Sequence, residues 1–189
     1  MTEQIEVGRI EHKFLDHKID PQTETLIIGT FNPKDTATLR NDADFFYSRG
    51  NHLWNLLPKA FDKESNSLIG KTKEEKIEFI RANHIDFIDL ISAIEGSPVD
   101  FKDAYLDRAK KIEWRNVIEE IKKLRFLKRA CITRKSFDDV PNIKMEVKKI
   151  ETYFSDKKEI VFRCLHTPAR YYSEDIQAEW TNFLLSKPA

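Results

Sequence analysis

Short apolar runs alternate with amphipathic stretches along this chain. Three of the runs are rich in β-branched residues and are bounded by turn residues, which is typical of buried strands. These runs cover residues 25–30, 85–91 and 160–165, and a weaker run covers residues 129–133. The pattern therefore predicts four short strands.

The segments between these runs carry apolar residues three and four positions apart, the spacing of one face of a helix. This spacing predicts helices over residues 52–61, 73–83, 105–123 and 173–185. Alternation of strand and helix favours a parallel sheet, because parallel strands need long crossover connections. We therefore expect an α/β fold, a three-layer sandwich with a mainly parallel four-stranded central sheet flanked by helices. Ligands of such folds bind at the carboxyl ends of the strands.

The chain is expected to form a single domain. No repeat, low-complexity tract or Pro/Gly/Ser-rich linker interrupts its 189 residues. A chain of this length buries roughly 70% of its surface on folding, and its 40% hydrophobic content argues against disorder. We expect one domain over residues 1–189, with a short N-terminal extension over about residues 1–21.

Composition narrows the classes of partner and cofactor. Lys plus Arg and Asp plus Glu both number 32, so any site for a polyanion has to be a local basic patch. Two cysteines, Cys131 and Cys164, are too few for a four-thiolate site, and no pair of histidines has metal-ligand spacing. We therefore expect reduced thiols, no metal and no other cofactor.

The sequence carries no pattern of a membrane or export segment. Its first residues are polar and acidic, and nowhere do about 18 apolar residues run together. We expect a cytoplasmic protein that has no membrane partner.

Polar segments follow the predicted strands, and these are the places where ligand chemistry is expected. Residues 29–35 read Gly-Thr-Phe-Asn-Pro-Lys-Asp, which is not a phosphate-binding glycine pattern. Residues 45–54 place three aromatic residues before a polar cluster that opens a helix, and core packing alone does not require that cluster. The last strand runs into residues 166–172, a loop with a proline, a cation and aromatic residues.

These segments, in this order, resemble the motifs of the uracil-DNA glycosylase superfamily, most closely its hypoxanthine-DNA glycosylase-like branch. Residues 26–31 resemble a strand that ends in Gly-Ser-Phe-Pro, with the proline one position later here. Residues 46–54 resemble Tyr-Gly-His-Pro-Arg-Asn-x-Phe-Trp, with Asn51 and Trp54 in register. Residues 86–100 resemble Leu-Trp-Asp-Val-Val and the Gly-Ser-x-x-Asp after it, and residues 166–169 resemble a closing Ser-Pro-Ala.

The resemblance covers nearly the whole chain and implies a metal-independent DNA glycosylase of base excision repair, expected to act as a monomer. Such an enzyme flips a deaminated base, of the uracil or hypoxanthine class, out of DNA and hydrolyses its N-glycosidic bond. It implies that Asn51 is catalytic and holds the attacking water. Asn32, one position late in the first motif, is the second candidate, and His166 is a candidate donor to a base oxygen.

The remaining candidates are contacts to the base or to DNA. The base-binding candidates are Gly29, Thr30, Phe31, Phe46, Tyr47 and Asp89. The DNA-binding candidates are Arg49, Thr167, Pro168, Ala169 and Arg170.

Each candidate also has a structural interpretation. Asn51 suits the cap of the helix that follows it, and Asn32 suits a turn before proline. Asp89 suits a helix cap or a partner of a buried arginine, His166 suits a structural role, and the aromatic residues suit the core. At the level of function, the alternatives are a non-catalytic nucleic-acid or nucleotide-binding module and a hydrolase of free nucleosides.

Overall fold

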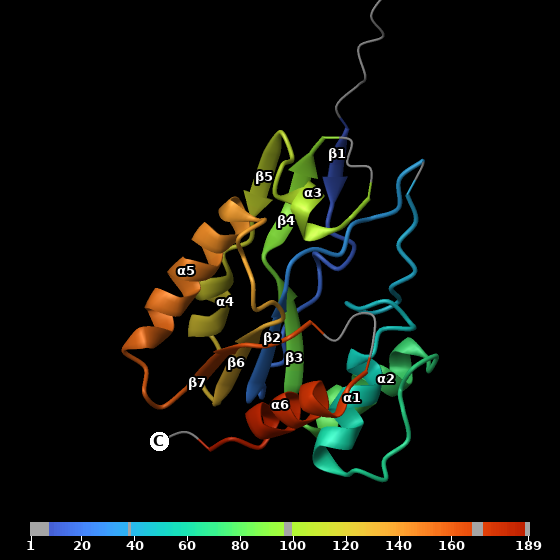
Figure 1. Ribbon diagram of the computed structural model, residues 1–189, viewed down its shortest axis with the longest axis vertical. Helices are drawn as coiled ribbons and strands as arrows, with labels where there is room; N and C mark the ends of the chain where they lie inside the picture. Colours follow the sequence, from blue (N-terminus) through green and yellow to red (C-terminus); the bar gives the residue numbers. More distant parts are fainter. Residues whose placement is uncertain (1–7, 38, 97–99, 168–171, 188–189) are drawn as a thin grey trace, which may run out of the picture.

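The computed structural model describes residues 8–37, 39–96, 100–167 and 172–187, and a four-stranded parallel sheet lies at its centre (Figure 1). The strands are β2 (Thr25–Gly29), β3 (Ile85–Asp89), β6 (Arg129–Ile132) and β7 (Val161–Cys164). Their order across the sheet is β3-β2-β6-β7, and every neighbouring pair is parallel. The four predicted strands and the parallel sheet are confirmed.

Helices cover both faces of this sheet (Figure 1). The helices are α1 (Leu53–Phe61), α2 (Lys73–Ala82) and α6 (Glu174–Leu184) on one face, and α4 (Val117–Lys122) and α5 (Pro141–Ser155) on the other. Successive side chains of a strand point to opposite faces. Accordingly, Ile27 packs with α1 and α6, while Ile28 packs with α4 and α5. The arrangement is compatible with the expected three-layer sandwich.

Local side-chain hydrogen bonds explain where two of the predicted helices begin. The Thr72 hydroxyl accepts from the Glu75 N–H (3.2 Å), and the Glu75 carboxylate accepts from the Thr72 N–H (2.8 Å). This capping box satisfies two N–H groups at the start of α2. The Ser173 hydroxyl accepts from the Ile176 N–H (3.2 Å) in the same way at the start of α6. The structure confirms the helices predicted near residues 52–61, 73–83 and 173–185.

The single helix predicted over residues 105–123 is wrong. That segment forms the end of α3 (Asp103–Leu106), strand β5 (Lys111–Trp114) and α4. Strand β5 pairs with β4 (Ile91–Glu95), which pairs in turn with β1 (Arg9–Glu11) in a second, antiparallel sheet. Pairing with a distant strand has therefore overridden the local helical spacing. For the same reason the run over residues 85–91 is divided at Leu90, where the chain passes from one sheet to the other.

Helix α5 was not among the predicted helices, although it has 15 residues. Its buried residues are Ile143, Val147, Ile150 and Phe154, which recur at helical spacing. The signal of an amphipathic helix was therefore present in the sequence.

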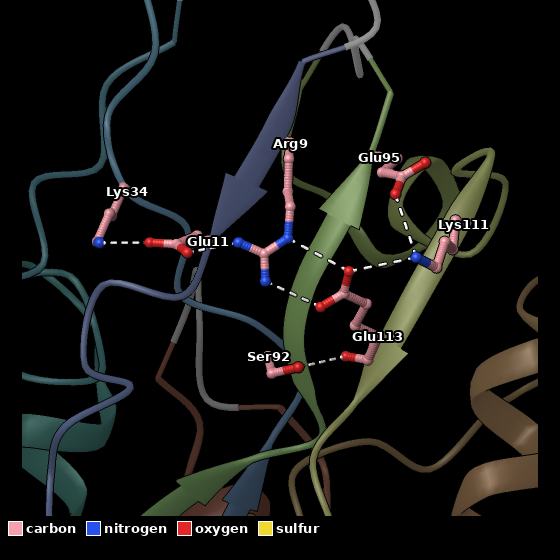
Figure 2. A network of polar contacts seen from close by, with 7 residues as sticks. All are labelled: Arg9, Glu11, Lys34, Ser92, Glu95, Lys111 and Glu113. Atoms are coloured by element: carbon pink, nitrogen blue, oxygen red, sulfur yellow. Dashed lines mark hydrogen bonds and ion pairs between the residues drawn. The ribbon is translucent and has the colours of Figure 1, made fainter.

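Charged side chains join the three strands of the second sheet across its exposed face (Figure 2). The Arg9 guanidinium on β1 donates to both carboxylate oxygens of Glu113 on β5, at 3.3 and 2.9 Å. Glu11 accepts from Lys34 (2.7 Å), and Glu95 from Lys111 (3.2 Å). Because water screens exposed pairs, each adds little to stability, and the backbone pairing of the strands sets their order.

The segment expected to be an N-terminal extension is packed into the fold from Arg9 onward. After β1 the side chain of His12 is completely buried. Farther along, the backbone N–H of Asp20 donates to the Asp86 carboxylate on β3 (2.8 Å). Residues 9–20 therefore close one side of the parallel sheet.

Candidate functional site

An open cavity of about 340 Å³ lies where the carboxyl ends of the parallel strands meet. Its floor includes Gly29 at the end of β2, Asp89 at the end of β3 and Thr133 just after β6. The volume falls within the range of small-molecule sites, roughly 300–1,000 Å³. The predicted location of the ligand site is the location of this cavity.

Most of the candidate residues meet in this cavity. The candidates that line it are Gly29, Thr30, Phe31, Asn32, Phe46, Tyr47, Asn51, Asp89 and Thr167. Arg49 and His166 do not line it. The candidates Pro168, Ala169 and Arg170 lie outside the described residues, as do residues 97–99 of the motif that follows the second strand.

Asp89 is the centre of a buried hydrogen-bond network. Its Oδ2 atom accepts from Nε2 of His12 (2.8 Å) and from the side-chain amide of Asn32 (2.6 Å). Nδ1 of His12 accepts from the backbone N–H of Phe14 (2.9 Å), so Nε2 is the nitrogen that carries the proton. His12 is 0% and Asp89 1% exposed. Both of these bonds are to Oδ2, and within the described residues the second carboxylate oxygen, Oδ1, has no hydrogen-bond donor.

The close approach of Asp89 to the end of β2 requires glycine at position 29. A Cβ atom on Gly29 would lie 2.3 Å from Oδ1 of Asp89 and 3.2 Å from the hydroxyl oxygen of Tyr47. Contacts this short force the neighbouring side chain to move. Gly29 therefore fixes the position of the carboxylate on the cavity floor.

The two asparagines of the site are held by opposite ends of their side-chain amides. Oδ1 of Asn51 accepts from the backbone N–H of Leu53 (2.9 Å) at the start of α1, which leaves its Nδ2 group as a donor. The amide of Asn32 donates to Asp89, which leaves its Oδ1 atom as an acceptor. Within the described residues, neither free end has a hydrogen-bond partner in the protein. Asn51 thus fixes the turn that leads into α1 and lines the cavity, and Asn32 presents the acceptor.

The aromatic residues of the second motif are mostly core. Phe46 is buried and stacks on Phe87 and Phe14, with ring centroids 5.5 and 5.3 Å apart. Its φ angle of 47° is a strained conformation for a residue other than glycine, and this packing holds it. The Tyr47 hydroxyl donates to the hydroxyl of Thr133 (3.3 Å). Burial, with a smaller contribution from Asp89, raises the pKa of Tyr47 well above its ordinary value, so the phenol stays neutral.

Two predicted residues have partners outside the cavity. The backbone N–H and Nδ1 of His166 both face Oε2 of Glu179 on α6, at 2.9 and 2.8 Å. The ring, 53% exposed, lies instead in a separate depression that Lys135 and Glu179 also line. Arg49 pairs with Asp44 (3.5 Å). His166 therefore faces Glu179 and not the cavity, and Arg49 lies on the surface beside Asp44.

Sequence reasoning missed two polar residues of the site. His12 lies in the expected extension, and no local pattern links it to a carboxylate 77 residues later. Asp103 lines the cavity and pairs with Arg134 (2.8 Å). Burial raises the pKa of Asp103 above its ordinary value, and hydrogen bonds from Arg134 and Thr30 offset only part of that effect. Local sequence does not identify either residue as part of the site, because only tertiary packing brings them to the cavity.

The described residues were also searched for a metal site and for a membrane-spanning helix. Among the residues that the structure describes, no three His, Cys, Asp or Glu side chains are placed to hold a metal ion. None of the described helices is long and apolar enough to cross a membrane.

Comparison of the chain with protein-family models, with curated proteins and with solved structures finds no match, so a function has to be argued from the geometry of this cavity.

Proposed function

We propose that the protein is a DNA glycosylase of the uracil-DNA glycosylase type, which takes a deaminated base into this cavity and hydrolyses its N-glycosidic bond. The proposal rests on the meeting of four separate segments of the chain in one place. Segments around residues 30, 50, 89 and 167, which resemble successive motifs of one enzyme superfamily, line a single cavity. The parallel sheet with helices on both faces is the architecture that the resemblance implies.

The polar groups of the cavity suit a deaminated base. Deamination converts a ring nitrogen of adenine or cytosine from an acceptor into an N–H donor and replaces the neighbouring amine with a carbonyl. The free Oδ1 of Asp89 accepts from such an N–H group and repels the lone pair of the parent base. The free Nδ2 group of Asn51 is a donor for the new carbonyl oxygen.

The hydrogen bonds favour Asn32 as the residue that holds the attacking water. A water that attacks carbon needs an acceptor for one of its hydrogens, and Asn32 presents a free Oδ1 while Asn51 presents a donor. The water oxygen bonds to C1′ of the sugar, and the electrons of the glycosidic bond pass to the base. The base takes up the proton that the water releases. Asn51 stabilises the negative charge that develops on the base.

Single-turnover cleavage tests the proposal. Oligonucleotides that carry uracil, hypoxanthine or xanthine, single-stranded and double-stranded, are incubated with the protein and then cleaved by alkali at abasic sites. We expect cleavage of at least one substrate. Asn32→Ala should lower its rate by about 10² or more, and Asn51→Ala by about 10-fold or more.

Asn116→Ala is the matched control, because Asn116 caps α4 through its side chain and does not line the cavity. Its free energy of unfolding should fall, because the helix cap is lost, and its cleavage rate should stay at that of the wild-type protein. DNA binding by the wild-type protein without any abasic product would contradict the proposal and favour a non-catalytic binding module. Release of bases from free nucleosides alone would favour a nucleoside hydrolase.

A further inference from the structure

A second cavity, of about 660 Å³, lies apart from the one at the strand ends. It lies between residues 13–21, helix α2 and strand β3, which is at the edge of the parallel sheet. The two cavities are separated by a layer of aromatic rings. Phe45 lines the larger cavity, Phe46 lines the smaller one, and their ring centroids are 5.2 Å apart.

Four cationic side chains line the larger cavity: Lys13, Lys18, Lys73 and Arg81. In the part of the chain that the structure describes, Lys18, Lys73 and Arg81 form no ion pair. The ammonium group of Lys13 donates to the backbone carbonyl of Asn41 (2.8 Å), and the nearby Asp35 carboxylate interacts with its charge.

The carboxylates of this cavity do not balance these charges. Asp86 is buried, and it accepts from Nε2 of His17 (2.7 Å) and from the backbone N–H groups of Asp20 (2.8 Å) and Phe87 (2.7 Å). Its charge therefore serves to anchor residues 17–20 to β3. Asp20 accepts from the N–H of Gln22 (2.8 Å), and Asp16 is the remaining acidic residue. Four cationic residues against three carboxylates leave a small positive surplus at this cavity, which favours an anion.

Lys13 connects the two cavities. Its side chain lines the cationic cavity, and its backbone N–H donates to the carbonyl of Asn32 (2.6 Å). Its ammonium group reaches Asn41, and both Asn32 and Asn41 line the smaller cavity. Lys13 is therefore in contact with the lining of both cavities.

We propose that the cationic cavity binds the phosphodiester backbone of the nucleic acid strand that supplies the flipped nucleotide. This inference rests on the proposed function. Lys73 and Arg81 are eight residues apart on α2, which is about 12 Å along the helix axis. That separation suits two phosphates of a strand that are not adjacent better than it suits a single phosphate ion. The cavity thus adds phosphate contacts to those expected of Arg49, which lines neither cavity.

Fluorescence anisotropy of a short, undamaged single-stranded oligonucleotide tests this inference. The variant is the double substitution Lys73→Ala and Arg81→Ala, and both residues are exposed, so we expect its thermal unfolding to be unchanged. The matched control is Lys148→Ala with Lys158→Ala, which removes two exposed lysines elsewhere. We expect the first variant to bind about tenfold more weakly or worse, and to lower the slope of log affinity against log salt by about 1.5. The control should change neither.

Equal losses in the variant and in the control would overturn the inference, because binding would then depend on total charge alone. Binding of inorganic phosphate or tripolyphosphate that needs Lys73 and Arg81, with oligonucleotide binding that does not, would overturn it in favour of a small-anion site. The proposed function is tested separately. If no abasic site forms but oligonucleotide affinity still depends on these two residues, the glycosylase proposal fails and the strand-binding surface stands.

Discussion

Asp89, at the end of β3, accepts a hydrogen bond from His12, which lies 77 residues earlier in the chain and is completely buried. Together with Asn32, His12 compensates a carboxylate that has almost no access to water. The carboxylate on the cavity floor therefore depends on a residue from the N-terminal strand region.

We predict that His12→Ala lowers the free energy of unfolding by about 3 kcal/mol, because removal of one partner of a buried pair leaves a charge with too few donors. Guanidinium unfolding at pH 7 measures the change. His166→Ala is the control, because its pair with Glu179 is more than half exposed on the histidine side. It should cost less than about 1 kcal/mol. If the two variants lose the same free energy of unfolding, the buried contact between His12 and Asp89 stabilises the fold no more than an exposed pair does.

Gly29→Ala is predicted to inactivate the site with only a moderate loss of stability. The added Cβ would lie 2.3 Å from Oδ1 of Asp89, so the carboxylate has to move and its hydrogen bonds to His12 and Asn32 are distorted. We expect the cleavage rate to fall at least about tenfold and the free energy of unfolding to fall by about 1–3 kcal/mol.

The control for this prediction is Gly50→Ala. A Cβ at Gly50 would meet no atom within 4 Å, although Gly50 lies next to Asn51. Its cleavage rate should stay close to that of the wild-type protein. Full activity of Gly29→Ala would mean that the position of Asp89 does not matter.

The sequence was a good guide where one local signal determines the outcome. Residues 26–28 form an unbroken β-branched and apolar run, which is typical of a strand buried on both faces, and the carboxyl ends of such strands lie at one edge of a parallel sheet. This is why Asn32, Asn51 and Asp89 were expected to meet, and they do line one cavity.

Where the outcome depends on a distant partner, the sequence was a poor guide. Residues 111–114 alternate well enough for a strand, but only their pairing with β4 decides against the helix that their neighbours favour. His166 was expected at the cavity, and a carboxylate on α6 holds it elsewhere. Neither partner is identifiable from local pattern.

Asp103 and Asp139 should give opposite pH dependences although both pair with Arg134. Burial raises the pKa of Asp103, so between its ordinary value of 3.8 and the raised value the folded state binds more protons than the unfolded state. Its ionisation therefore lowers stability as the pH rises through that window. The hydrogen bond from Arg134 lowers the pKa of the exposed Asp139, so its contribution is present above pH 3.8 and is lost as the pH falls.

Unfolding free energies of Asp103→Asn and Asp139→Asn, measured between about pH 3 and pH 7, test this pair. The difference between the wild-type protein and Asp103→Asn should fall with rising pH, and the difference for Asp139→Asn should rise. Arg134 keeps one carboxylate partner in each variant, so the comparison is matched. Curves of the same sign would contradict the assignment of burial as the dominant cause at Asp103.

Cys164, at the end of β7, is predicted to react slowly with thiol reagents although it is only partly buried. Burial, reinforced by the neighbouring carboxylate of Glu151, raises the pKa of its thiol from 9.0 to about 12. This raised pKa lowers the fraction of thiolate at pH 8 by about 10³, and the thiolate is the reactive form. Alkylation by iodoacetamide in a Cys131→Ser background should therefore be about 10³ times slower in the folded protein than in denaturant.

Adding Glu151→Gln should speed the reaction of the folded protein, because the carboxylate contact at 3.6 Å from Sγ is removed while the burial remains. An unchanged rate in that variant would mean that burial alone protects the thiol.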